Sequence, residues 1–104
     1  MKPLIIFTSY PNRSSAQKIA KILVKNRLAA CVQILGPIES HYWWKTRQEK
    51  SKEYLVLIKS TKKKYLEIEK TITDLHPYEI PEIIAVPVSL GFSKYLNWMS
   101  DSIS

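Results

Sequence analysis

One segment of the sequence, from His76 to Glu82, concentrates side chains that could do chemistry. It places a histidine, a tyrosine and two carboxylates around Pro77 and Pro81, whose rings restrict the backbone. Glu79 and Glu82 could act as acid and base or bind a cation, and His76 could ligate a metal or carry a proton. The alternative, which spacing alone favours, is a rigid loop whose polar groups satisfy backbone donors after a helix end.

Other residues that could take part in chemistry lack a supporting sequence pattern. Cys31 lies in an apolar stretch and is predicted to be a small buried hydrophobe, because a reactive thiol needs a nearby cation and some exposure. Cys31, His41 and His76 show no metal-ligand spacing, so the sequence does not support a dedicated zinc site.

The run from Lys62 to Lys64 stands at the start of a predicted helix, where cations oppose the helix dipole. Together with free backbone N–H groups it could bind an anion, although a solvated charge run is the favoured interpretation. The net charge of +7 also suggests an anionic partner, but scattered lysines serve solubility equally well. Since no nucleic-acid-binding signature is present, we predict no nucleic-acid partner.

Hydrophobic periodicity predicts the elements that must position these residues. Strands are expected at 4–7, 29–35, 54–58 and 83–88, and helices at about 14–26, from 61 to 76 and after 93. The order β-α-β-β-α-β with a C-terminal helix predicts an α+β, ferredoxin-like fold with an antiparallel sheet and helices on one face. All 104 residues are assigned to one domain.

Several local features are predicted within these elements. Ser14 and Gln17 fit a capping box, and Thr61 can cap the second helix. The buried stripe of that helix is expected to end at Leu75, and Pro87 is expected to place the last strand at an edge or to mark a bulge. The polar stretch 45–53 is predicted to be a hairpin loop with irregular strand ends.

The segment 29–44 points to self-assembly. If extended, it spans on the order of 50 Å, whereas a 100-residue domain has a radius of gyration of about 13 Å. Such a hairpin overhangs its own domain unless it bends at Gly36 and Pro37, and another copy is the obvious support. Trp43 and Trp44 face opposite sides of a strand, so one is expected in the core and the other towards solvent or a partner.

Two bulk features predict the compartment. One cysteine allows no intrachain disulfide, and no apolar run approaches the ~20 residues of a membrane helix. The apolar part of the N-terminus is also too short for a signal peptide. These observations predict a cytoplasmic protein with no membrane partner.

The sequence resembles the CutA family of divalent-cation tolerance proteins through motifs spread along nearly the whole chain. The matching motifs are Pro11-Asn12, 28–32 (LAACV), Tyr42 with Trp44, Ile58-Lys59 with Thr61, 76–84 (HPYEIPEII), and Gly91 followed by Tyr95-Leu96 and Trp98. The resemblance implies a ferredoxin-like fold, a homotrimer and a role in tolerance of copper and other divalent metals, with no established reaction. Glu79 and Glu82 are the only plausible acid/base pair and lack a clear nucleophile, so we predict no enzyme activity.

The resemblance also suggests where ligands bind. Some bacterial relatives hold copper at positions that correspond to Thr8, Leu75 and His76, of which only His76 can ligate metal here. The candidates for copper or another divalent cation are therefore His76, Glu79 and Glu82. A similarity to PII-type signalling proteins gives an alternative, a small anion or nucleotide in clefts between subunits. The candidate residues for that cleft are Cys31, Trp44, Lys59, Thr61, Tyr78 and Glu82.

Overall fold

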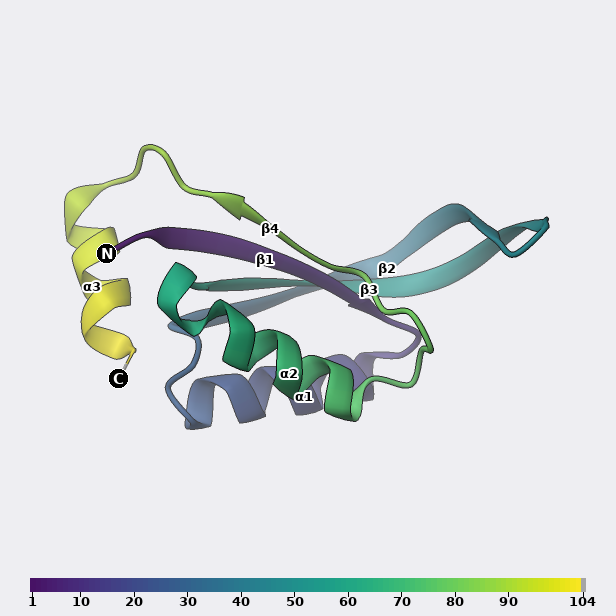
Figure 1. Ribbon diagram of the computed structural model, residues 1–104, viewed down its shortest axis with the longest axis horizontal. Coiled ribbons are helices and arrows are strands. Elements are labelled where there is room, and N and C mark those ends of the chain that lie inside the picture. The colour runs from purple at the N-terminus through teal and green to yellow at the C-terminus, as the bar shows by residue number, and fades with distance from the viewer. Residues whose placement is uncertain (104) are drawn as a thin grey trace.

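The computed structural model describes residues 1–103, and its elements follow the predicted order (Figure 1). The strands are β1 (Pro3–Tyr10), β2 (Cys31–Trp44), β3 (Arg47–Thr61) and β4 (Ile83–Pro87). The helices are α1 (Arg13–Lys25), α2 (Tyr65–Leu75) and α3 (Ser93–Ser102), and a 3₁₀ turn, η1 (Lys62–Lys64), precedes α2. The predicted α+β, ferredoxin-like arrangement is confirmed.

The strands form one antiparallel sheet in the order β2-β3-β1-β4. Strand β3 lies between β1 and β2, the two strands that α1 connects, which is the split βαβ arrangement. Pro87 ends β4 at one edge of the sheet, where the missing N–H of proline is tolerated, so the predicted edge position is confirmed.

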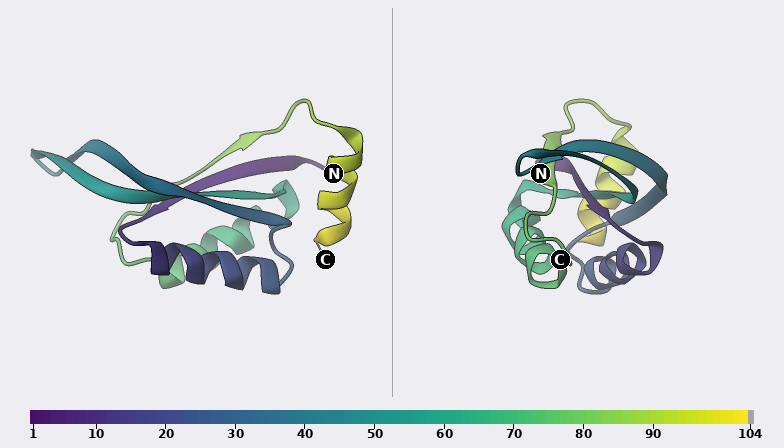
Figure 2. Two further views of the ribbon diagram at one scale, coloured as in Figure 1. Left: turned by 180° about the vertical axis from the view of Figure 1, so that it is seen from behind. Right: turned by 90° about the vertical axis from the view of Figure 1, so that its right-hand side faces the viewer.

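Helices α1 and α2 cover one face of the sheet, and α3 stands across its end beside the N-terminus (Figures 1 and 2). Alternate residues of each strand point towards α1 and α2 because side chains alternate along a strand. Ile6, Val56 and Ile58 from the sheet are fully buried against Ile68 and Ile72 of α2. No helix in the described part of the chain is long and apolar enough to cross a membrane.

The other face of the sheet is apolar, and within residues 1–103 no helix lies along it (Figures 1 and 2). Cross-strand neighbours there include Leu57 beside Phe7, Phe7 beside Ile84, and Leu55 beside Leu35. Leu35 is 50% exposed and Ile84 is 57% exposed. This surface, called here the open face, consists of Ile5, Phe7, Leu35, Leu55, Leu57, Ile84 and Val86.

The β2–β3 hairpin projects beyond the helices, and the molecule is 44 Å long (Figure 1). The predicted overhang is confirmed, but the predicted loop at 45–53 is wrong. Pairing continues to Trp44 and Arg47, so only Lys45 and Thr46 make the turn. A two-stranded ribbon surrounded by water needs no apolar face to pair its backbone, so the polar sequence did not reveal the strand. The register shifts between Leu35 and Ile38, where Gly36 and Pro37 interrupt the ladder.

The two tryptophans near the tip of the hairpin do not divide as predicted. Trp43 is 71% exposed, and Trp44 is half-buried beneath Lys45, whose Nζ lies 5.7 Å from its ring centroid. Neither ring reaches the core, because this part of the ribbon extends past the helices. The prediction that one of them joins the core is wrong.

Three predictions about helix ends also need correction. Asn12 caps α1, because its Oδ1 accepts from the Ser15 N–H at 2.8 Å, and Ser14 only donates to the same oxygen. Thr61 makes no capping hydrogen bond, since η1 separates it from α2. Leu75 is 47% exposed because the next residue, His76, takes the position against the sheet.

Candidate functional site

His76 is fixed by both of its ring nitrogens. Nε2 lies 2.7 Å from the Ser9 carbonyl oxygen, to which it donates, and Nδ1 accepts from the Tyr78 N–H at 3.0 Å. The imidazole also stacks on the Tyr10 ring, with 4.3 Å between centroids. Burial lowers the pKa of His76, outweighing the opposing effects of the Ser9 carbonyl and the Glu53 charge. The ring is therefore a neutral positioning group with no free lone pair.

A buried carboxylate ties the segment after α2 to two strands. Glu53 on β3 is only 8% exposed, and its Oε2 accepts from the Tyr78 hydroxyl at 2.7 Å and from Ser9 Oγ at 3.3 Å. Burial, followed by the hydrogen bond to Glu53, raises the pKa of Tyr78. These bonds let a charge stay buried, because hydrogen bonds to the carboxylate offset its lost hydration.

Sequence reasoning missed Glu53 because it was placed in the predicted loop 45–53. One signal could have found it. Glu53, Leu55 and Leu57 alternate along the strand, so extending the strand by a single residue places Glu53 at the edge of the open face. Its partners Ser9 and Tyr78 lie 44 and 25 residues away in the sequence, and no local pattern links them.

A cleft lies between the β2–β3 hairpin, from its base at Glu53 to its turn at Lys45, and the loop after α2. It is lined by Ser9, Ser40, His41, Tyr42, Trp43, Trp44, Lys45, Glu49, Glu53, Pro77, Tyr78, Glu79, Ile80, Pro81 and Glu82. Four carboxylates against one lysine make the cleft acidic in a chain of net charge +7. Burial, and then the neighbouring Glu53 charge, raises the pKa of Glu82. The cleft therefore suits cations better than anions.

The predicted ligand residues divide among three places in one chain. Trp44, Tyr78 and Glu82 meet in the acidic cleft together with Glu79. Cys31 is half-buried opposite Lys59 on the open side of the sheet, so the prediction of a fully buried thiol is wrong. The uncovered sheet face explains this exposure.

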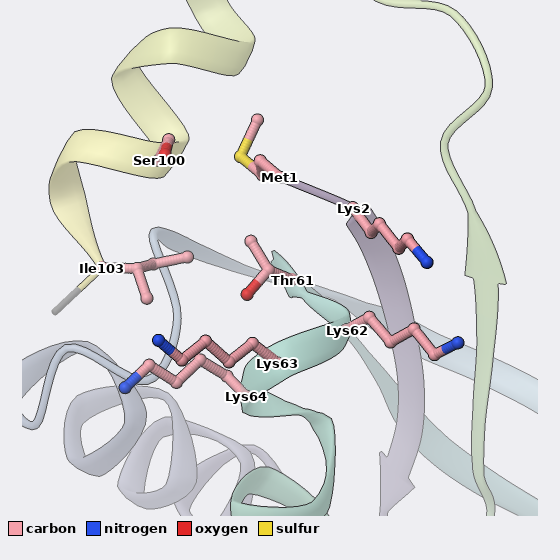
Figure 3. Close-up of a pocket in the computed structure, with 8 residues that line it drawn as sticks. All are labelled: Met1, Lys2, Thr61, Lys62, Lys63, Lys64, Ser100 and Ile103. Carbon is pink, nitrogen blue, oxygen red and sulfur yellow. The ribbon is translucent and has the colours of Figure 1, made fainter.

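The remaining two predicted residues lie near the N-terminus. The Lys59 Nζ stands 5.5 Å from the centroid of the Tyr95 ring of α3. Thr61 lines a separate pocket with the lysines of η1 (Figure 3). The predicted cleft residues therefore do not form one site within a single chain.

The positions that correspond to copper ligands in some relatives do not fit a copper site here. Thr8 is fully buried with an unpartnered hydroxyl, Leu75 is apolar, and both nitrogens of His76 are engaged. In the described residues no group of three or more His, Cys, Asp or Glu side chains is arranged to hold a metal ion. A copper ion at His76 would first have to break one of two hydrogen bonds.

Fold and site together define a class: a ferredoxin-like α+β protein with a projecting aromatic hairpin and a proline-bounded loop anchored on a buried glutamate. Residues 4–102 match the family described as CutA1 divalent ion tolerance protein. The chain belongs to this family, as its motifs indicated.

Relatives match along almost the whole chain. The divalent-cation tolerance protein CutA of Thermus thermophilus is 36% identical over 98 residues, covering 94% of this chain and 95% of the relative. The chloroplastic CutA of Arabidopsis thaliana is 34% identical over 95% of this chain, which spans only 54% of that longer protein. The crystal structure of CutA from Xylella fastidiosa superposes with a TM-score of 0.95 at 38% identity, covering 100% of both chains.

The relatives correct the predicted location. CutA of Archaeoglobus fulgidus, whose structure matches with a TM-score of 0.95 at 31% identity over 98% of this chain and 99% of its own, is described as periplasmic. The Arabidopsis relative is chloroplastic. The prediction of a cytoplasmic protein is therefore wrong. It relied on the single cysteine, but a chain with one cysteine forms no intrachain disulfide in any compartment.

Proposed function

We propose that this chain forms a homotrimer that supports divalent-cation tolerance by binding or signalling rather than by catalysis. The observation that carries the proposal is the open face. Its apolar side chains span all four strands of the sheet, whereas the opposite face is covered by α1 and α2. Monomeric soluble proteins rarely expose an apolar patch of that extent.

Copies of the same chain are the occupants that fit this face best. Strands β2 and β4 form the two edges of the sheet and pair with no further strand within residues 1–103, so both can pair with strands of a neighbour. The hairpin carries the exposed Trp43 beyond its own domain, and tryptophan is enriched at the centres of interfaces. A closed ring of three copies would cover the open face, pair the edge strands and support the projecting hairpin. It agrees with what the resemblance to CutA proteins implies.

The acidic cleft is the part of the chain best suited to divalent cations. Glu79 and Glu82 present carboxylate oxygens at its rim, and hard divalent cations prefer such ligands. His76 acts behind them by holding the loop, because its nitrogens already serve Ser9 and Tyr78. A neighbouring copy lying along the hairpin would complete a shell that one chain leaves open.

Two of the polar side chains of the loop already serve the architecture. His76 donates to the Ser9 carbonyl and Tyr78 donates to Glu53, which supports a binding role for the loop. The alternative of an anion or nucleotide in this cleft is not favoured, because Glu53 and Glu82 would repel it. We therefore propose no second function for the cleft.

Light scattering on the purified chain, coupled to size exclusion, tests the assembly. We expect a mass close to three times the 12.1 kDa of one chain. Ile84→Asp places a charge on the open face and should yield smaller species, because burying an unpaired carboxylate is costly. Leu66→Asp is the matched control, since Leu66 is 75% exposed on α2 and should leave the trimer intact. A wild-type monomer at micromolar concentration would overturn the proposal.

A further inference from the structure

The pocket beside the N-terminus lies apart from the acidic cleft and has the opposite charge. It is bordered by Met1, by η1 and by the last turn of α3, with Ser100 and Ile103 on its far side (Figure 3). All its charged side chains within the described residues are lysines, and none is a carboxylate. Its volume of about 510 Å³ is ample for a small oxyanion.

Lys63 and Lys64 bring two positive charges to this pocket. Their side chains extend in the same direction below Thr61, towards the Ile103 side, whereas those of Lys2 and Lys62 extend the other way (Figure 3). Neither Lys63 nor Lys64 forms an ion pair within residues 1–103. Placing like charges side by side without a counter-charge is unfavourable, so an arriving anion relieves repulsion.

Thr61 brings a hydroxyl group to the same pocket. The residue is only 9% exposed, and its side chain makes no capping hydrogen bond to η1. The hydroxyl points into the space that Lys63 and Ile103 border (Figure 3). It can therefore donate a hydrogen bond to an oxygen atom placed in the pocket.

We propose that Thr61, Lys63 and Lys64 form a binding site for a phosphate-bearing anion. The hydroxyl donates to a phosphate oxygen, and the two ammonium groups neutralise its charge. Because Met1 and Ile103 are the only large apolar residues at the border among residues 1–103, and none of these residues that line the pocket is aromatic, the site recognises phosphate groups and not a base. Pyrophosphate is therefore the probe.

Calorimetric titration with pyrophosphate at low ionic strength tests the proposal on the assembled protein. Thr61→Val, which removes only the hydroxyl, should weaken binding about tenfold, the usual worth of a hydrogen bond to a charged group. Lys63→Met with Lys64→Met should abolish measurable binding. ADP should bind no more than about threefold more tightly than pyrophosphate, because stacking on an aromatic ring is needed for more.

A matched control separates a site from bulk attraction. Lys18→Met with Lys21→Met makes the same charge change on two exposed residues of α1 and should bind like wild type. Equal loss in both double variants, or no binding by wild type, would overturn the proposal. Amide chemical shifts of the wild type give a second measurement that needs no variant. With pyrophosphate, shifts should centre on residues 61–66, and shifts centred on α1 would contradict the site.

Discussion

The Tyr78 hydroxyl donates a 2.7 Å hydrogen bond to the buried carboxylate of Glu53, joining the loop after α2 to the base of the hairpin. This contact connects two segments that the sequence patterns did not link, the loop 76–82 and the polar stretch 45–53. Ser9 of the central strand donates to the same carboxylate oxygen. The loop, the hairpin and the sheet are therefore held by one acceptor.

Loss of the Tyr78 hydroxyl should destabilise the protein. Tyr78→Phe keeps the ring but leaves Glu53, at 8% exposure, with Ser9 as its only donor among the described residues. We expect the free energy of unfolding to fall by about 1–3 kcal/mol per chain, the usual cost of leaving a buried charged acceptor short of a donor. Chemical denaturation at fixed protein concentration measures this change.

Tyr42→Phe is the control for that experiment. Tyr42 lines the same cleft and is 42% exposed, so deleting its hydroxyl should change stability by less than about 0.5 kcal/mol. Equal effects of the two substitutions would mean that the Tyr78–Glu53 bond has no special weight.

Replacing Gly36 at the kink of the hairpin is predicted to destabilise the protein. Its φ of +150° lies in a region that favours glycine, and an added Cβ would stand 2.7 Å from the Tyr54 ring and 3.0 Å from the Glu53 carbonyl oxygen. Gly36→Ala should cost about 1–3 kcal/mol because of backbone strain, with further loss from the clash. Thermal unfolding gives the value.

Gly91→Ala serves as the comparison. An added Cβ there meets only the flexible end of Leu96 at 3.0–3.1 Å, which can shift, so the loss should be clearly smaller than at Gly36. A larger loss at Gly91 would contradict the assignment of strain to the hairpin kink.

Local patterns predicted most of the fold, because each depends on residues close in sequence. Ile19 and Leu23 recur at helical spacing, and Ile6 and Ile58 lie in short apolar runs, so α1, β1 and the core end of β3 could be placed. The outer half of the hairpin could not, because its strands are stabilised by pairing with each other in water. Apart from the alternation that reaches Glu53, nothing in the polar stretch 45–53 distinguishes a paired ribbon from a loop.

The site was only partly predictable from the sequence, because some of its contacts join residues that are distant in sequence. Pro77 and Pro81 predicted a rigid loop whose polar groups satisfy backbone donors, and His76 does accept from the Tyr78 N–H. A metal-binding role for His76 stays a prediction. The acceptor Glu53 is reached only after the sheet brings distant residues together. Sequence alone also could not show that Thr61 lies far from Tyr78 in one chain, because both belong to motifs typical of the same family.

Removing the Glu82 charge should stabilise the protein near neutral pH. Its pKa is raised above 4.5 by burial and by Glu53, so the folded state holds the proton more tightly than the unfolded state. Stability contributed by this group is present at low pH and is lost as pH rises through the raised value. Glu82→Gln should therefore gain up to about 1 kcal/mol at pH 7, a small gain because solvent screens an exposed side chain.

Unfolding of wild type and Glu82→Gln at pH 7 and at pH 4 measures this effect. The difference should shrink at pH 4, which lies below the pKa of Glu82 in both states, so the charge is largely lost in both. Glu67→Gln is the control, because Glu67 lies in the first turn of α2, where its charge is favourable and its loss brings no gain. A constant difference between the two pH values would contradict a role for the Glu82 charge.

His76 should make stability fall as the solution is acidified. Its pKa is lowered from 6.5 by burial, so as pH drops below 6.5 the unfolded state takes up a proton before the folded state does. The stability that the neutral ring contributes is complete above 6.5 and is lost towards the lowered value. Protonation would also place a proton on Nδ1, which now accepts from the Tyr78 N–H, and would break that bond.

The measurement is the free energy of unfolding between pH 7.5 and 5.5 for wild type, His76→Gln and His41→Gln. The wild type and His41→Gln should both lose stability with acidification, because both retain His76, whereas His76→Gln should show a flatter profile. His41 is exposed beside Glu39 and takes no part in the stack of His76 on Tyr10, so His41→Gln is the control for loss of a histidine elsewhere. Identical profiles for the two variants would show that His76 does not couple protonation to folding, and the loop would then be held chiefly through Tyr78 and Glu53.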